Sequence, residues 1–261
     1  MARPLADERP GASPRTWARR LACVAFWVAT WQLCAWAVGT DVVLAGPLQV
    51  AGALLGLLPT PGFWCSLGLS LARVGTGLLL ASASAVLLAA LAARHGVVRD
   101  LLAPAVAVVK AVPVASFVIL VLLWVPSSRL SVVISFLMAF PVVYTNVLEG
   151  LDSIDPGLLE MARVFGVRGP ALACVYLQQV LPYLRAGLSL ALGLSWKAGI
   201  AAEVIGLPAR SVGEHLYEAK VMLDSAGLLA WTLAVVLVSV AVESLVRRAL
   251  ARACERMGEA A

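Results

Sequence analysis

The run LGLSLARVGTGLLLASASAVLLAALAA, residues 67–93, carries a single charged side chain, that of Arg73. About 20 consecutive apolar residues are enough for a helix to cross the hydrocarbon core of a bilayer. A stretch of this length and composition therefore predicts a membrane span. It decides the class of the whole chain, because a protein that contains such a span has lipid as part of its solvent.

The overall composition also indicates a membrane protein. Of the 261 residues, 61% are hydrophobic and 13% are charged, and the mean hydropathy is +0.93. Soluble domains carry about 25% charged residues. The net charge of +5 could indicate nucleic-acid binding, but the basic residues lie at the edges of the apolar runs and few aromatic residues lie among them. We therefore expect no nucleic-acid partner and relate the charge to membrane orientation.

Several further apolar runs extend this reading to the whole chain. The sequence predicts an all-α, polytopic membrane protein with about six spans, over Leu21–Gly39, Leu67–Ala93, Leu101–Val125, Leu130–Leu148, Ala186–Leu207 and Ala226–Val242. Pro104 and Pro113 are expected to kink the third span, where freed carbonyls could line a pathway. Between the first two spans, the proline-flanked piece LQVAGALLGLL (48–58) favours an interfacial helix on the outer surface over a re-entrant segment.

Both chain ends are expected to be tails. Residues 1–20 are rich in Pro, Ala and Arg and show no periodicity, which predicts a mobile cytoplasmic tail. Residues 251–261 are expected to form a second cytoplasmic tail, so that the transmembrane domain covers 21–250. Arg19 and Arg20 before the first span also fit a signal peptide, but the apolar run is longer than a usual signal sequence and favours an uncleaved span.

Basic residues gather on one side of the predicted spans. With six spans both termini share a side, and outside the spans that side carries Arg3, Arg9, Arg15, Arg19, Arg20, Arg94, Arg99, Arg163, Arg168, Arg247, Arg248, Arg252 and Arg256. The opposite side has Arg129, Arg210 and Lys220. Because cytoplasmic loops carry an excess of Lys and Arg, we expect both termini and the 149–182 connection to be cytoplasmic.

The sequence offers no pattern for catalysis or metal binding. The five cysteines form no C-x-x-C pair, and His95 and His215 stand alone in polar connections, so we expect no disulfide framework and no metal site. None of the three lysines follows a glycine, which excludes a G-x-x-x-x-G-K-[ST] phosphate loop in this chain. We expect no catalytic residue and no bound cofactor. An intramembrane enzyme that uses Glu203 or Glu243 is the less favoured alternative.

Between the fourth and fifth spans, the stretch DPGLLEMARVFG (155–166) predicts a short capped helix. Asp155 can accept hydrogen bonds from free amides at a helix start, and Pro156 suits the first helical position. Gly166 can take the left-handed conformation that closes a helix. Because an isolated helix of this length is marginal in water, it must pack on something.

Two faces of this helix are distinguishable. The apolar positions with helical spacing are Leu158, Leu159, Ala162 and Phe165. Glu160 and Arg163 occupy another face. One face is expected to rest on the ends of the spans and the other on a partner. The alternative is an ordinary cytoplasmic loop helix with nothing bound.

The residues of this connection resemble a known pattern. Glu160-Met161-Ala162, Gly166 and Leu181-Pro182 look like the E-A-A, G and L-P pattern in the cytoplasmic loop of permeases from binding-protein-dependent ABC importers. The similarity runs from about Phe63 to Ala249 and includes S-L-x-R-V-x-x-G at 70–77, K-A-V-P at 110–113, F-P at 140–141, G-L-x-x-I-D-x-x-L-L-E-M-A-R at 150–163 and W-K-A-G-I-A-A-E-V-I-G at 196–206. Together these segments resemble the permeases of the nitrate/sulfonate/taurine importer family. Met161 stands where the pattern has alanine.

The resemblance implies a type I ABC importer permease fold in the bacterial plasma (inner) membrane. It implies that 155–166 form a coupling helix, inserted into a groove on a separate ATPase. Glu160 and Arg163 would then make polar contacts, Ala162 would allow close approach, and Gly166 would turn the chain back toward the membrane.

The partners implied by the resemblance are two copies of the ATPase, an extracytoplasmic solute-binding protein and a second copy of this chain. ATP and Mg would be bound by the ATPase and not by this chain. The transported species is expected to be a small polar or anionic solute, such as a sulfonate, taurine or nitrate. The alternative from another class is a secondary transporter or channel that works without ATP.

Charged residues inside the predicted spans are candidates for the translocation pathway, since such residues normally face a bundle interior or water. Arg73, Lys197 and Glu203 are the ones we expect to matter. Lys197 and Glu203 lie six residues apart, about 120° around a helix, so they are not expected to pair directly. Lys197 or Arg73 could attract an anion, and a buried structural pair is the alternative.

Overall fold

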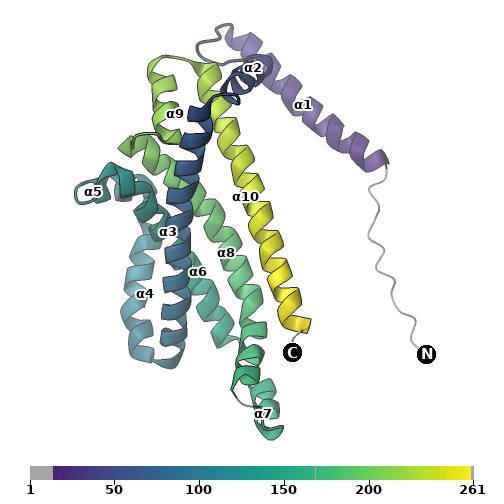
Figure 1. Ribbon diagram of the computed structural model, residues 1–261, viewed down its shortest axis with the longest axis vertical. Helices are drawn as coiled ribbons and strands as arrows, with labels where there is room; N and C mark the ends of the chain where they lie inside the picture. Colours follow the sequence, from purple (N-terminus) through teal and green to yellow (C-terminus); the bar gives the residue numbers. More distant parts are fainter. Residues whose placement is uncertain (1–13, 168, 260–261) are drawn as a thin grey trace.

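The computed structural model of the protein describes residues 14–167 and 169–259 (Figure 1). Within these ranges all regular secondary structure is helical. The helices are α1 (Pro14–Val38), α2 (Pro47–Leu57), α3 (Pro61–Arg94), α4 (Gly96–Ala111), α5 (Val114–Leu122), α6 (Ser127–Asp152), α7 (Pro156–Val164), α8 (Pro170–Gly206), α9 (Val212–Val221) and α10 (Ser225–Glu259). The predicted all-α architecture is confirmed.

Five of the described helices are long and apolar enough to cross a membrane, namely α1, α3, α6, α8 and α10. Helices α4 and α5 pass the same test together, which raises the number to six. The expected number of about six spans therefore agrees with the structure. The short apolar helix α2 lies where the sequence predicts an interfacial helix, between the first two spans.

The third predicted span is broken. Helices α4 and α5 meet at an angle of 104°, and Val112 and Pro113 between them are extended, with ψ of 131° and 135°. A residue before proline is disfavoured in the helical conformation, which explains the position of the break. The predicted bend at Pro113 is confirmed. It is large enough to end one helix and begin another. Helix α4 continues through Pro104.

The helices extend beyond the apolar runs that predict them. Helix α8 begins at Pro170 instead of Ala186, and α10 continues to Glu259 instead of ending near Val242. Residues 14–20 of the expected N-terminal tail belong to α1, and 251–259 of the expected C-terminal tail belong to α10. Hydropathy marks only the part of a helix in lipid, whereas Ala, Arg and Glu continue helices into water. Residues 1–13 and 260–261 of these tails lie outside the described residues.

Helix α6 lies at the centre of the bundle, packed against α3 and α8, with α4 outside α3 and α6. A ladder of small residues makes the close contact possible. It consists of Ala81, Ala85, Ala89 and Ala92 on α3, all buried against Ala139, Val143 and Val147 of α6. Small residues are the usual means of close helix packing in lipid, where apolar burial provides no driving force.

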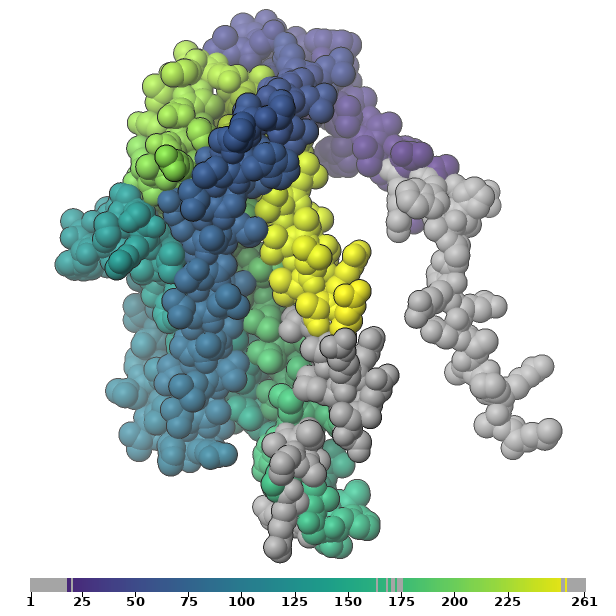
Figure 2. Space-filling model, viewed as in Figure 1, coloured from purple at the N-terminus to yellow at the C-terminus, as the bar shows by residue number. Residues whose placement is uncertain are grey.

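The two ends of the bundle carry different short helices (Figure 1). Helix α7 lies at the same end as the α3–α4 turn and the C-terminus of α10, whereas α2 and α9 lie at the other end. Helix α1 leans away from the bundle and packs against α2. In the space-filling view, this N-terminal helix meets the rest of the molecule near α2 (Figure 2). The end with α7 we name the α7 end, and the other the α9 end.

Substituting Gly199 tests the close packing of the bundle. A Cβ at Gly199 would lie 2.6 Å from both the Ser135 hydroxyl oxygen and a Val74 methyl group, whereas one at Gly193 would meet no atom within 4 Å. We expect Gly199→Ala to lower the free energy of unfolding by about 1–3 kcal/mol, the usual cost of overpacking. Thermal unfolding in detergent, with Gly193→Ala as the control on the same helix, measures the difference. Equal stability of the two variants would contradict this packing.

Candidate functional site

Helix α7 has the ends that the sequence predicts. The Asp155 carboxylate accepts a hydrogen bond from the Gly157 amide at 2.8 Å, and Pro156 is the first helical residue. At the other end Gly166 has φ of 69°, and the Val167 amide donates to the Ala162 carbonyl at 2.8 Å. This last bond spans the closing turn as in a Schellman motif. Local residue types are therefore sufficient to start and stop this helix.

One edge of α7 is attached to the bundle. Ala162 is buried and Leu159 is half-buried. The Asp155 amide donates to the Gln179 side-chain oxygen on α8 at 2.9 Å. These contacts hold a helix that would be marginal by itself. They also tie its start to α8, the helix that follows it in the chain.

The rest of the apolar side of α7 is exposed. Leu158, Met161, Val164 and Phe165 are all exposed, and we call these four residues the apolar face of α7. Leu158, Leu159, Ala162 and Phe165 share helical spacing, but only Leu159 and Ala162 of these four are turned toward the bundle. The apolar arc is wider than the contact that the bundle offers, and Phe165 lies beyond the last helical residue. Glu160 is exposed, and the Arg163 side chain lies outside the described part of the structure.

Leu181 and Pro182 belong to a helix and not to a loop. Both belong to α8, Leu181 half-buried and Pro182 exposed. Much of the expected coupling loop is thus helical, because 149–152 end α6 and 170–182 begin α8. Few residues separate α7 from α6 and from α8 along the chain, so α7 is connected closely to both helices.

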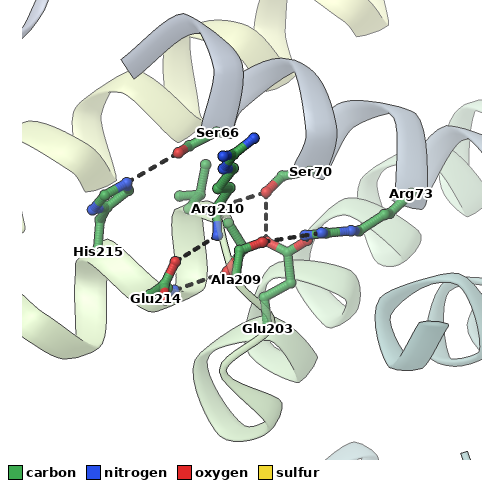
Figure 3. A network of polar contacts seen from close by, with 10 residues as sticks. Ser66, Ser70, Arg73, Glu203, Ala209, Arg210, Glu214 and His215 are labelled. Atoms are coloured by element: carbon green, nitrogen blue, oxygen red, sulfur yellow. Dashed lines mark hydrogen bonds and ion pairs between the residues drawn. The ribbon is translucent and has the colours of Figure 1, made fainter. Parts of the chain in front are cut away.

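A second cluster lies near the α9 end, where a polar network crosses between α3 and α8 (Figure 3). Glu203 of α8 is fully buried. The Ser70 hydroxyl of α3 donates to one Glu203 carboxylate oxygen at 2.6 Å, and the Arg73 guanidinium lies 3.5 Å from the other. Ser70 and Arg73 lie one turn apart on α3 and thus reach the same carboxylate.

The same network holds the chain that follows α8. Arg73 also donates to the Ala209 carbonyl at 3.2 Å, and the Val212 amide donates to the Ser70 hydroxyl at 3.0 Å. Leu207 and Arg210 have positive φ of 47° and 55°, which reverses the chain between α8 and α9. Helix α9 then packs so closely that a Cβ on Gly213 would collide with the backbone of Glu203. Three helices therefore meet at one carboxylate.

The contacts of Arg73 and Glu203 indicate a structural role for both side chains. A buried charge is tolerated when it is paired and its oxygens accept hydrogen bonds, and Glu203 has both. The half-buried Arg73 and the buried Glu203 form an ion pair, which agrees with the structural pair that the sequence left open as an alternative. The sequence reasoning missed Ser70, although its position three residues before Arg73 in the S-L-x-R segment was a signal for a shared face.

Lys197 is placed differently from Arg73 and Glu203. It is exposed on α8, and it does not pair with Glu203, as expected from their spacing. It belongs to a stripe of exposed residues on α8 that we call the α8 stripe: Ala186, Leu190, Leu194, Lys197, Ala201 and Ile205. No ion pair to Lys197 is found among the described residues.

The sequence predicts that His215 lies in a loop, and this prediction is wrong. His215 lies in α9, its ring stacks on Trp231 of α10 with centroids 4.5 Å apart, and its Nε2 lies 3.0 Å from the Ser66 hydroxyl of α3. These contacts extend the polar network across the α9 end (Figure 3). Within the described ranges, no group of three His, Cys, Asp or Glu side chains is arranged to hold a metal ion.

A family model matches most of the chain. Residues 85–254 match the model described as binding-protein-dependent transport system inner membrane component. The match includes α7 and the whole of α8. It thus contains both the apolar face of α7 and Glu203.

Individual relatives are similar over a large part of their length. A putative aliphatic sulfonates transport permease protein, SsuC, of Bacillus subtilis is 26% identical over 216 residues, which cover 82% of this chain and 78% of the relative. The nitrate import permease protein NrtB of Synechococcus elongatus is 26% identical and covers 70% of each chain. The taurine transport system permease protein TauC of Escherichia coli is 28% identical, over 69% of this chain and 72% of its own.

Removing one partner of the Arg73–Glu203 pair tests the polar network. Arg73→Leu leaves the buried carboxylate without a counter-charge, and we expect it to cost about 3–5 kcal/mol of unfolding free energy. Glu203→Gln should restore part of that stability when added to Arg73→Leu, because the amide still accepts a hydrogen bond from Ser70. Thermal unfolding of the two single variants and the double variant in detergent gives the interaction free energy between the two side chains.

The exposed Arg99–Asp152 pair, with a shortest N–O distance of 2.7 Å, provides the control for this cycle. Both of its side chains are more than a third exposed, and an exposed pair contributes about 0–1 kcal/mol. Arg99→Leu should therefore change stability little. Strictly additive effects of Arg73→Leu and Glu203→Gln would contradict the pairing.

Proposed function

The chain belongs to the family of binding-protein-dependent transport system inner membrane components, and from that premise we propose that α7 couples it to a separate ATP-hydrolysing subunit. It is an ABC importer permease of the nitrate, sulfonate and taurine group, a membrane protein that is not itself an enzyme. In this proposal α7 is the coupling helix. ATP and Mg bind to the ATPase, and the movement of the ATPase on ATP binding and hydrolysis is transmitted to this chain through α7.

The apolar face of α7 is the observation that carries the proposal. Leu158, Met161, Val164 and Phe165 form a row of large exposed apolar side chains on a helix outside the apolar spans. Exposed apolar patches of this kind mark interaction surfaces, and an amphipathic helix binds by laying its apolar face into a groove. Glu160 lies beside the row and supplies a polar contact at its rim. Met161, which replaces alanine in the family pattern, fills part of the groove.

The connection between α7 and α8 supports transmission of movement. Helix α8 starts soon after α7 and runs without interruption from Pro170 to Gly206, which is about 55 Å along an α-helix. The Asp155–Gln179 hydrogen bond ties the two helices together. A displacement of α7 by the ATPase thus moves α8, with Leu181 and Pro182 on its first part, and through Glu203 it reaches α9.

The orientation follows from charge. Arg94 and Arg99 lie near the α3–α4 turn and Arg247, Arg248 and Arg252 near the end of α10, all at the α7 end. By the positive-inside rule this end faces the cytoplasm, and both termini lie on the same, cytoplasmic side of the plasma membrane. The α9 end, with α2 and α9, then faces outward and receives solute from an extracytoplasmic binding protein.

Lys197 supports a pathway along the α8 stripe. A lysine facing hydrocarbon near the bilayer centre costs about 2.5–3.5 kcal/mol on insertion scales. A second copy of the chain facing this stripe would remove Lys197 from lipid and enclose a pathway between the two copies, with Lys197 as the charged group of an otherwise apolar stripe. The lysine then attracts a small anionic solute. Nitrate, sulfonates and taurine, which the names of the relatives give, are solutes of this class.

Replacing one valine of α7 tests the coupling proposal. Val164 is 82% exposed, and Val97 at the start of α4 is 81% exposed at the same end of the molecule. We expect Val164→Asp to reduce ATPase recovery with the tagged chain by about tenfold or more, because a charge enters an apolar groove. Val97→Asp should leave recovery and ATP-driven uptake unchanged. Glu160→Lys and Gly166→Pro are expected to act as Val164→Asp does.

The coupling assignment fails if Val164→Asp, Glu160→Lys and Gly166→Pro all keep the ATPase bound and uptake coupled to ATP. Solute movement by the purified chain without ATP would instead identify a secondary transporter or channel. Both outcomes are read from the same reconstituted vesicles, with and without the ATPase.

Substitution of Lys197 tests the pathway. We expect Lys197→Met to raise the KM for an anionic solute by about tenfold, the effect of losing one charge-assisted contact, without loss of the bound ATPase. Lys197→Arg keeps the charge and should keep most of the uptake. Uptake measured over a range of binding-protein and solute concentrations separates the two variants. An unchanged KM in Lys197→Met would remove the α8 stripe from the pathway.

A further inference from the structure

A shallow, open pocket between α8 and α10, which we call the cavity, is lined by two arginines. It has a volume of about 230 Å³ and is lined by Arg185, Ala186 and Ser189 of α8 and by Arg247 of α10. It lies apart from the apolar face of α7 and from the Glu203 network, and it borders the α8 stripe at Ala186. Two guanidinium groups beside one cavity repel each other unless an anion lies between them.

Both arginines lie at a similar distance from the ends of their helices at the α9 end. Arg247 follows Ser225, the first residue of α10, by 22 residues, which is about 33 Å along a helix. Arg185 precedes Gly206, the last residue of α8, by 21 residues, or about 32 Å. A hydrocarbon core about 30 Å thick that begins at these two helix ends would finish at the level of both arginines. With the membrane placed in this way, both side chains would lie among the lipid head groups at the α7 end.

The charge at the cavity is positive after local pairing. Arg247 forms an ion pair with Glu243 one turn earlier, at 3.5 Å, and both side chains are more than a third exposed. This single contact leaves most of the five guanidinium N–H donors of Arg247 available. Arg185 is half-buried and makes no ion pair within the described part of the chain. The three side chains together carry one net positive charge.

We propose that this cavity binds the phosphate group of a phospholipid, and prefers lipids with a net negative head group. Arg185 and Arg247 donate to the phosphate oxygens from two sides, and the Ser189 hydroxyl is a third donor. Arginine binds phosphate through paired, charge-assisted hydrogen bonds, and basic pockets between spans suit anionic head groups. The proposed orientation would place the lipid in the inner leaflet.

The surface of α10 beside the cavity accommodates the acyl chains. Val240 and Val236 lie on the same face of α10 as Arg247, two and three turns nearer the middle of the membrane, and both are exposed. This apolar strip continues from the head-group donors into the hydrocarbon region. A free phosphate ion would use the arginines and leave the strip unused, so the strip favours a lipid.

A bound lipid would act as a wedge between α8 and α10. Near the α9 end these helices are in contact, as the Trp196 indole donates to the Val235 carbonyl at 3.3 Å. Toward the α7 end they border the cavity instead. Since α8 follows the coupling helix, a lipid at this position would adjust how α8 moves relative to α10.

Lipid retention by the full-length chain tests this site. The chain is reconstituted in phosphatidylcholine vesicles with phosphatidylglycerol as a minor component, extracted in mild detergent, and analysed by native mass spectrometry for bound lipid. We expect the wild type to retain phosphatidylglycerol selectively. Arg185→Gln/Arg247→Gln should reduce this retention by about tenfold or more, since two charge-assisted contacts are lost.

Two further variants keep the test informative. Arg248→Gln/Arg252→Gln removes the same charge from α10 outside the cavity and should retain the lipid as the wild type does. Ser189→Leu fills the cavity without changing its charge and should lose the lipid, which separates binding in the cavity from general attraction. The measurement needs no ATPase, so it stands independently of the coupling assignment.

Three results would overturn the proposal. The first is equal retention in the wild type and in Arg185→Gln/Arg247→Gln. The second is complete displacement of the lipid by inorganic phosphate, which would make the cavity a site for the free ion. The third is efficient cross-linking of two copies through Ser189→Cys in vesicles, which would show that a second chain fills the cavity.

Discussion

A single buried carboxylate holds the α9 end of this permease together. In lipid, a charge inside a bundle needs a partner and each of its oxygens needs a donor. Glu203 obtains these from Ser70 and Arg73, and the same two side chains hold the Ala209 carbonyl and the Val212 amide. The position of α9 relative to α3 and α8 therefore depends on one site. The close approach of Gly213 to the Glu203 backbone leaves little freedom for α9 to shift by itself.

Helix α8 connects this site with α7. It is continuous from Pro170 to Gly206, with α7 attached near its first turns and Glu203 near its last. Its middle packs on α6 and α3 through residues without bulk, such as Gly199. Polar contacts hold the middle of α8 as well, because the Ser135 hydroxyl of α6 donates to the Ser195 carbonyl at 3.2 Å and the Ser195 hydroxyl donates to the Ser135 carbonyl at 3.3 Å. Helix α8 is therefore tied to its neighbours along its length by both hydrogen bonds and close packing.

Charged residues in the spans take three separate roles. Arg73 and Glu203 form an ion pair inside the bundle, Lys197 is exposed on α8, and Arg185 and Arg247 border a cavity between α8 and α10. Their hydropathy is alike, and the sequence could rank them only by their distance from the ends of the apolar runs. The direction in which each side chain points is what separates a structural pair from a residue available to a solute or a lipid.

The sequence by itself determined the features that depend on neighbouring residues. These are the helical class, the apolar spans, the cap of α7 at Asp155, its closure at Gly166 and the break at Pro113. Each depends on hydrogen bonds or dihedral angles within a few residues. Only the tertiary structure decided that Ser70 and Arg73 meet Glu203, that His215 stacks on Trp231, and that Leu158 and Phe165 are exposed while Ala162 is buried. Those outcomes depend on how helices distant in the chain rotate and pack against each other, and a pattern of residue types along one helix does not contain that rotation.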